Sequence, residues 1–150
     1  MNREIKFRVW LPEDEIMLYS ENDINGDFME IWSFEGVEIQ ETRFREMGGE
    51  IHEVSDYVKP ENQSLMQFTG LKDKNAKDIY ESDILKCDFS KDGSHDSIQV
   101  VEFYEGSFGS RNKNDHFRIP ALFSGRATEG MNLNYYEVIG NIHENKDLLS

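Results

Sequence analysis

The sequence is poorest in cysteine, with Cys87 alone among its 150 residues. One cysteine cannot form an internal disulfide or a cysteine metal cluster, so we expect neither to stabilise the fold. A lone cysteine in an apolar strand segment is typically small apolar filling, and that is the role we expect. The alternative is a nucleophilic thiol activated by the neighbouring Lys86.

Long apolar runs are also missing. No stretch approaches the ~18 consecutive apolar residues that a membrane helix needs. The start of the chain, MNREIKFRVW, is charged and alternating, so it lacks the apolar core of a secretory signal. Together these absences predict a cytoplasmic protein without a membrane partner.

Positive charge is scarce: 16 Lys and Arg face 30 Asp and Glu, a formal net charge of -14. This balance repels phosphate backbones and disfavours nucleic acid as a partner. The segment Val9–Thr42 has no Lys or Arg at all, and its acids are Glu13, Asp14, Glu15, Glu21, Asp23, Asp27, Glu30, Glu35, Glu38 and Glu41. We favour a solubilising face, and the alternative is an acidic surface that docks on a basic partner or imitates DNA.

Recognisable cofactor motifs are missing too. His95, His116 and His143 are scattered without the spacing of a zinc site. Gly48-Gly49 lacks the following Lys and Ser/Thr of a phosphate loop, and Gly106-x-x-Gly109 lacks a dinucleotide fingerprint. We therefore expect no cofactor, no bound metal and no catalytic residue.

The strongest metal or acid–base candidate is the group Glu50, His52 and Glu53 with Asp56 nearby. On a strand Glu50 and His52 point the same way, so a carboxylate and an imidazole could grip a divalent cation. A histidine flanked by acids is also expected by chance in a chain with 30 acidic residues. We favour chance and keep a metal-dependent hydrolase as an alternative.

Basic and aromatic residues interleave between Lys72 and Lys91, as on many surfaces that bind nucleic acid. The members are Lys72, Lys74, Lys77, Lys86 and Lys91 with Phe68, Tyr80 and Phe89. Five acids in the same stretch cancel these lysines: Asp73, Asp78, Glu81, Asp83 and Asp88. The net-neutral balance predicts weak binding at most.

The apolar pattern favours β-structure, because alternation is frequent and 12% of the residues are aromatic. In the first part we expect a hairpin of Arg3–Trp10 and Ile16–Tyr19 around a turn at Pro12, and a strand over Phe28–Phe34. Short strands are expected at Val37–Ile39 and Glu50–Val54, with Glu41–Met47 as a possible helical turn.

A polar stretch around Pro60 separates residues 1–60, an acidic β lobe, from residues 61–150. The second part offers five strands, which suggest a small barrel: Leu65–Phe68, Ile84–Phe89, Ile98–Tyr104, Phe117–Phe123 and Tyr135–Ile142. Ser107–Asp115 and Ser124–Asn134 are expected to be loops, and Glu144–Leu149 a closing helical turn.

Three blocks, REIKFRVW, LMQFTGLKDKNAKDIYESDILK and YYEVIGNIHEN, resemble the YopX family of phage and prophage proteins in sequence and order. The resemblance implies an all-β protein with an N-terminal lobe and a C-terminal SH3-like barrel, in the cytoplasm of a host bacterium. It also implies a homo-oligomer and no established activity, so it supplies no catalytic residues.

In the central block two positions depart from the family pattern, because Ala76 and Ser82 stand where it has glycine, and near the end Lys146 stands where the family often has proline. We expect Asn75 to take the left-handed conformation of the turn and Ala76 to avoid it. The turn Lys72–Lys77 is expected to face water, which makes this segment an architectural joint.

These observations predict a non-enzymatic interaction protein that associates with itself or docks on a host or phage protein. The alternative is a nucleic-acid-related function, through the Lys72–Lys91 surface, a hydrolase at Glu50, His52 and Asp56, or acidic mimicry of DNA.

Overall fold

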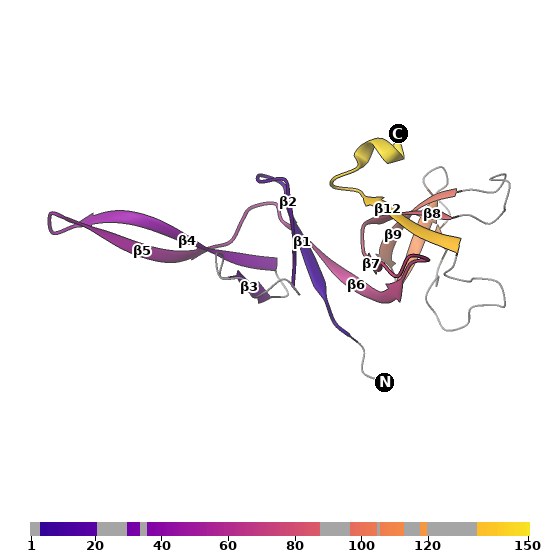
Figure 1. Ribbon diagram of the computed structural model, residues 1–150, viewed down its shortest axis with the longest axis horizontal. Helices are drawn as coiled ribbons and strands as arrows, with labels where there is room; N and C mark the ends of the chain where they lie inside the picture. Colours follow the sequence, from indigo (N-terminus) through magenta and orange to yellow (C-terminus); the bar gives the residue numbers. More distant parts are fainter. Residues whose placement is uncertain are drawn as a thin grey trace. The chain divides into compact units, whose positions relative to one another are not determined.

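The computed structural model describes residues 4–20, 30–33, 36–87, 97–104, 106–112, 118–119 and 135–150 (Figure 1). Its regular structure is almost entirely antiparallel β, which confirms the predicted fold class. The chain divides into an N-terminal unit, Lys6–Leu65, and a C-terminal unit, Met66–Ser150 with Met1–Ile5. The sequence placed the division slightly earlier, after residue 60. None of the described helices is long and apolar enough to cross a membrane.

The N-terminal unit begins with the predicted hairpin. β1 (Phe7–Leu11) pairs antiparallel with β2 (Ile16–Tyr19). Val9 and Leu11 pack with Val37 in a small core. The alternation of this segment predicts a half-buried strand with a charged outer face, but Lys6 and Arg8 on that face are 7% and 3% exposed, less than Phe7 between them.

A second sheet of the N-terminal unit has the strand order β3-β4-β5. Its strands are β3 (Glu30–Ser33), β4 (Gly36–Met47) and β5 (Glu50–Val58). The helical turn considered for Glu41–Met47 is wrong, because that stretch continues β4. The two short strands expected here are one long hairpin, which closes at Gly48 and Gly49 with positive φ angles of 67° and 88°.

Gln63 fixes the start of this hairpin. Its Oε1 accepts a hydrogen bond from the backbone N–H of Val37 at 2.7 Å, and its Nε2 donates to the carbonyls of Val37 and Pro60. A Cβ at Gly36 would lie 2.1 Å from that Oε1, so glycine is required for the close approach.

The division between the units falls within β6 (Ser64–Lys72). In the C-terminal unit β6 pairs with β7 (Asp78–Tyr80), and the register shifts between Phe68 and Lys72. Thr69 stabilises this irregularity, because its Oγ1 donates to the carbonyl of Ile79 at 2.8 Å and accepts from the N–H of Leu71.

The main sheet of the C-terminal unit curls into a half-barrel with the order β11-β10-β9-β8-β12, where the strand pattern predicted a small barrel and the family resemblance implied an SH3-like one. Its strands are β8 (Asp83–Cys87), β9 (Ser97–Tyr104), β10 (Ser107–Asn112), β11 (Arg118–Ile119) and β12 (Tyr136–Asn141). The short 3-10 helix η2 (Lys146–Leu149) follows, close to the predicted helical turn. The core cluster is Ile79, Leu85, Cys87, Val101, Tyr136 and Val138, with Leu71 packed against it.

One loop prediction is wrong. Ser107–Asn112, expected within a loop, is strand β10 and pairs along its whole length with β9. Its sequence SFGSRN has little apolar alternation, and β9 supplies the hydrogen-bonding partner that the local pattern does not reveal. The rest of that expected loop and the loop Ser124–Asn134 lie outside the described residues.

The expectation for the turn after β6 is also wrong. Ala76 has a φ of 64° and Ser82 a φ of 68°, whereas Asn75 is not among the described residues with positive φ. Both positions keep the left-handed backbone that favours glycine, although neither carries it. Tertiary contacts around the two turns therefore override the local preference.

Candidate functional site

The acid–histidine group of the sequence lies on β5. Glu50, His52 and Asp56 share one face of this strand, and His52 Nε2 is 3.9 Å from the Glu50 carboxylate. Asp56 is four residues further on, about 13 Å along the strand. Its carboxylate instead accepts a hydrogen bond from Arg45 Nη2 at 2.8 Å. These three side chains do not converge on one ion, and no metal-binding group of three or more such residues occurs in the described part of the chain.

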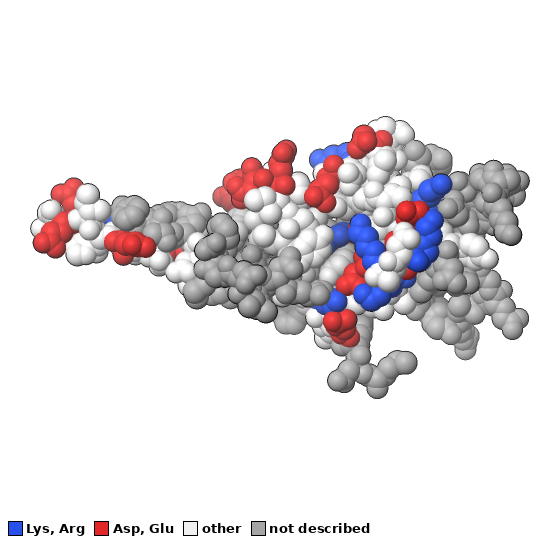
Figure 2. Space-filling model, in the orientation of Figure 1, with Lys and Arg blue, Asp and Glu red and all other residues white. Residues whose placement is uncertain are grey.

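Two lysines of the proposed nucleic-acid surface, Lys72 and Lys74, are paired with acids. Lys72 forms an ion pair with Asp78, and Lys74 Nζ lies 2.7 Å from the carboxylate of Glu137. Figure 2 shows basic and acidic side chains interspersed on this face of the C-terminal unit. Lys91, Phe89 and Asp88 lie outside the described residues. A surface of matched charges gives little attraction for a phosphate backbone.

Cys87 is fully buried in the core of the C-terminal unit, opposite Tyr136 on the neighbouring strand. Burial raises the pKa of the Tyr136 hydroxyl, with a smaller contribution from Cys87, so this hydroxyl stays protonated. A thiol in this position fills the core, as the sequence suggested. His143 lies in the turn after β12, where its backbone N–H donates to Asn141 Oδ1 at 3.0 Å, and His95 and His116 lie outside the described residues.

The charged turn between β6 and β7 is organised by Asp73, which is 6% exposed. Its Oδ1 accepts hydrogen bonds from the backbone N–H groups of Asn75 and Lys77 at 2.8 and 2.9 Å, and its Oδ2 accepts from that of Val138 at 2.9 Å. The prediction of a turn that faces water is therefore wrong for Asp73. The segment is a joint, as expected, but the buried Asp73 carboxylate makes the connection, between the turn itself and Val138 of the last strand.

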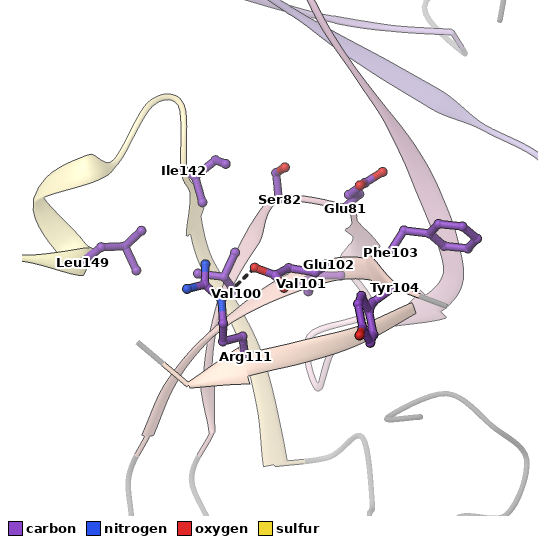
Figure 3. A pocket seen from close by; sticks show the side chains of 10 residues that line it. All are labelled: Glu81, Ser82, Val100, Val101, Glu102, Phe103, Tyr104, Arg111, Ile142 and Leu149. Carbon is purple, nitrogen blue, oxygen red and sulfur yellow. Dashed lines mark hydrogen bonds and ion pairs between the residues drawn. The ribbon is translucent and has the colours of Figure 1, made fainter. Parts of the chain in front are cut away.

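A cleft of about 500 Å³ opens on the C-terminal unit, a volume within the usual range of ligand pockets (Figure 3). The turn between β7 and β8 supplies Glu81 and Ser82, β9 supplies its last five residues, and β10 supplies Arg111. The segments after β12 complete the lining with Ile142 and Leu149.

Charged groups in this cleft have defined partners. Glu102 and Arg111 lie diagonally across β9 and β10, and Arg111 Nε is 2.8 Å from the Glu102 carboxylate. Burial raises the pKa of the Glu81 carboxyl, and hydrogen bonds from the backbone N–H groups of Gln67 and Phe103 partly oppose this shift. Phe103 and Tyr104 are 52% and 43% exposed. The cleft therefore combines a half-buried acid, an ion pair and exposed aromatic rings.

Sequence reasoning did not find this cleft, because its lining comes from segments far apart in the chain. The one local signal is the end of β9, where Glu102, Phe103 and Tyr104 stand together, and the sequence interpreted this stretch as an ordinary strand.

The β4–β5 hairpin is the other unusual surface. Residues 45–53, around its turn, are all exposed, although successive side chains of a strand point to opposite faces. The exposed set includes Met47 and Ile51, at 52% and 75%, and Tyr57 further along β5 at 41%. The described sheet ends at β5, whose outer edge has no described partner strand. Figure 2 shows acidic side chains at the far end of this hairpin.

Comparisons with known proteins find a matching family and a similar solved structure. The model of the family described as YopX protein matches residues 6–150. The crystal structure of protein EF1440 from Enterococcus faecalis is similar to this chain, with 27% sequence identity and a TM-score of 0.56, over 99% of this chain and 100% of that one. A search of curated proteins finds no match.

Proposed function

Because the chain belongs to the YopX protein family, we propose that it is a non-enzymatic interaction protein, and that it associates with a second copy of itself through the edge of β5. The single observation that carries the proposal is the exposure of the outer β4–β5 hairpin on both faces.

A two-stranded hairpin that buries neither face is marginally stable in water. Long unpaired edges that also expose apolar residues favour pairing with another strand, and natural proteins usually protect them. The β5 edge is nine residues long and carries Ile51 and Tyr57, both exposed. Pairing with a second chain would satisfy its free backbone groups and cover these side chains.

The sequence of β5 is complementary to itself in one antiparallel register. When Val54 lies opposite Val54 of the other copy, Ile51 faces Tyr57 and His52 faces Asp56. In the same register Glu53 faces Ser55, so like charges do not oppose each other between Ile51 and Tyr57. A pair of an aromatic and a β-branched side chain, such as Tyr57 and Ile51, stabilises a sheet by roughly 0.2–1 kcal/mol. Moving the centre by one residue towards the turn places Glu53 opposite itself across the two-fold axis, which is unfavourable.

A disulfide tests this register directly. Opposed residues of two antiparallel strands have Cα atoms about 4.5–5.5 Å apart, within the range of a disulfide. Val54→Cys should form a covalent dimer under mild oxidation, whereas Ile51→Cys, which faces Tyr57 of the other copy, should not. The readout is non-reducing electrophoresis beside a solution mass from light scattering, with wild-type protein as the background for the buried Cys87.

The two outcomes separate the register from the function. A solution dimer without a Val54→Cys cross-link would reject the register and leave self-association standing. A monomer at every concentration tested would overturn the proposed self-association.

Charge provides a matched pair of variants. Ser55→Glu should weaken the dimer, because it places a carboxylate opposite Glu53 of the other copy. The double variant Glu53→Lys, Ser55→Glu should restore it, because the same position then forms opposite-charge pairs. The double variant is expected to dimerise, so Ser55→Glu is the decisive variant. If it also dimerises as strongly as wild type, β5 does not form the interface.

Docking on a host or phage protein belongs to the same proposal as a second use of the exposed hairpin. The phage or prophage origin and the host cytoplasm are what the family resemblance implies. A nucleic-acid function receives less support, since Lys72 and Lys74 are ion-paired and Glu50, His52 and Asp56 do not converge. Acidic mimicry of DNA stays a hypothesis. It requires exposed carboxylates in the acidic segment, and Glu13, Asp14, Glu15 and Glu38 are exposed.

A further inference from the structure

The cleft beside β9 has a chemistry that the hairpin does not share. Its charged lining consists of two carboxylates, Glu81 and Glu102, and one guanidinium, Arg111, so with both acids ionised it carries a charge of -1 (-2 + 1). The other members are mainly apolar or aromatic. A cleft with this balance accepts a positively charged group more readily than an anion.

Arg111 and Glu102 already neutralise each other at 2.8 Å. Glu81 lines the cleft from the turn between β7 and β8 and is partly buried there. A carboxylate that is partly removed from water is a strong acceptor for an N–H donor that carries charge.

The aromatic and aliphatic residues complete the match. Phe103 packs edge-on against Phe108, with ring centroids 5.0 Å apart, yet half of its surface stays exposed. Exposed Phe and Tyr rings attract a cation placed over their faces. On the other side of the Glu102–Arg111 pair, Figure 3 shows Ile142 and Leu149 on the chain that follows β12. Such aliphatic groups suit the methylene stem of a long basic side chain.

We propose that this cleft binds an arginine or lysine side chain of a peptide, with its charged head at Glu81 and its aliphatic stem along Ile142 and Leu149. This inference does not depend on the association of β5 edges. It assigns to the C-terminal unit a recognition site for basic segments of partner proteins.

The test compares two peptides that differ in charge and not in shape. Acetyl-Gly-Arg-Gly-amide should shift the backbone amide resonances of Ser82, Glu102 and Arg111 in a saturable manner, and the peptide with neutral citrulline in place of arginine should not. Glu81→Gln should weaken the arginine peptide about tenfold, the effect of removing one charge-assisted hydrogen bond. Glu137→Gln, at a carboxylate outside the cleft that pairs with Lys74, should leave binding unchanged.

Three results would overturn the proposal. Equal binding of the arginine and citrulline peptides would show that the positive charge of the side chain does not contribute to binding. If the arginine peptide shifts only amide resonances outside the cleft, the peptide does not bind there. This result comes from the wild-type protein, so it holds even if Glu81→Gln unfolds and cannot be assayed. Tighter binding of spermidine than of the arginine peptide would identify a free amine, rather than a peptide side chain, as the ligand.

Discussion

Ala76 and Ser82 show how a single backbone angle can store strain in two neighbouring turns. Their φ angles of 64° and 68° lie in the left-handed region, which costs a residue with a Cβ roughly 1–2 kcal/mol. Hydrogen bonds hold both positions in place. The N–H of Ala76 donates to the carbonyl of Asp73 at 3.0 Å, and the N–H of Ser82 donates to that of Val101 at 2.9 Å.

We expect Ala76→Gly and Ser82→Gly each to stabilise the protein by about 1 kcal/mol, because glycine adopts this conformation without the steric cost. Urea unfolding followed by circular dichroism gives the free energy of unfolding. Gly48→Ala is the matched control, since Gly48 has a φ of 67° and open space around its Cβ position, and it should lose a similar amount. A loss of stability in both glycine variants would show that the turns are not strained.

At the scale of the element, Asp73 connects two backbone segments through three N–H groups that bond one carboxylate. It closes the turn between β6 and β7 and also anchors β12 through the N–H of Val138, 65 residues along the chain. Backbone N–H groups that lose a charged acceptor in a buried site retain the full cost of their removal from water.

Asp73→Ala is therefore expected to destabilise the protein by about 3 kcal/mol, the upper range for hydrogen bonds to a charged group. The control is Asn75→Ala in the same turn, because Asn75 is exposed and its substitution should change stability by less than about 0.5 kcal/mol. Differential scanning calorimetry of the three proteins gives the comparison. Equal stabilities for Asp73→Ala and Asn75→Ala would contradict this role of the carboxylate.

Elements with clear apolar alternation or apolar runs were predictable from the sequence, and those with polar patterns were not. β2, β8, β9 and β12 are close to their predicted ranges. β10 has one large apolar side chain, Phe108, so its local pattern carries little information. The outer part of the β4–β5 hairpin is polar, and the sequence predicted only its short strand Glu50–Val54. The burial of Asp73 could not be predicted from the local sequence either, because one of its hydrogen-bond partners, the N–H of Val138, is 65 residues away along the chain.

At the scale of the whole molecule, the sequence predicted the fold class and the charge but neither surface that we propose to be functional. The cleft joins residues from position 81 to position 149, and a single sequence gives no measure of which distant segments meet. The exposure of the hairpin on both faces was missed for a different reason. Alternating polar residues predict a strand, but they do not show that both of its faces stay in water.

Net charge governs how two such molecules meet. Each copy carries -14, so two copies repel each other over distances longer than the contacts at β5. The Debye length falls from ~30 Å at 0.01 M salt to ~8 Å at 0.15 M, which screens this long-range repulsion more than the short contacts of the paired strands.

Dimerisation should therefore strengthen as salt rises over this range, by about tenfold or more in the association constant, measured by sedimentation equilibrium. His52→Ala should keep the same salt dependence, because removing one local pair leaves the overall charge in place. Association that weakens with added salt would mean that attraction between charged groups, rather than pairing of the apolar β5 edge, holds the two copies together.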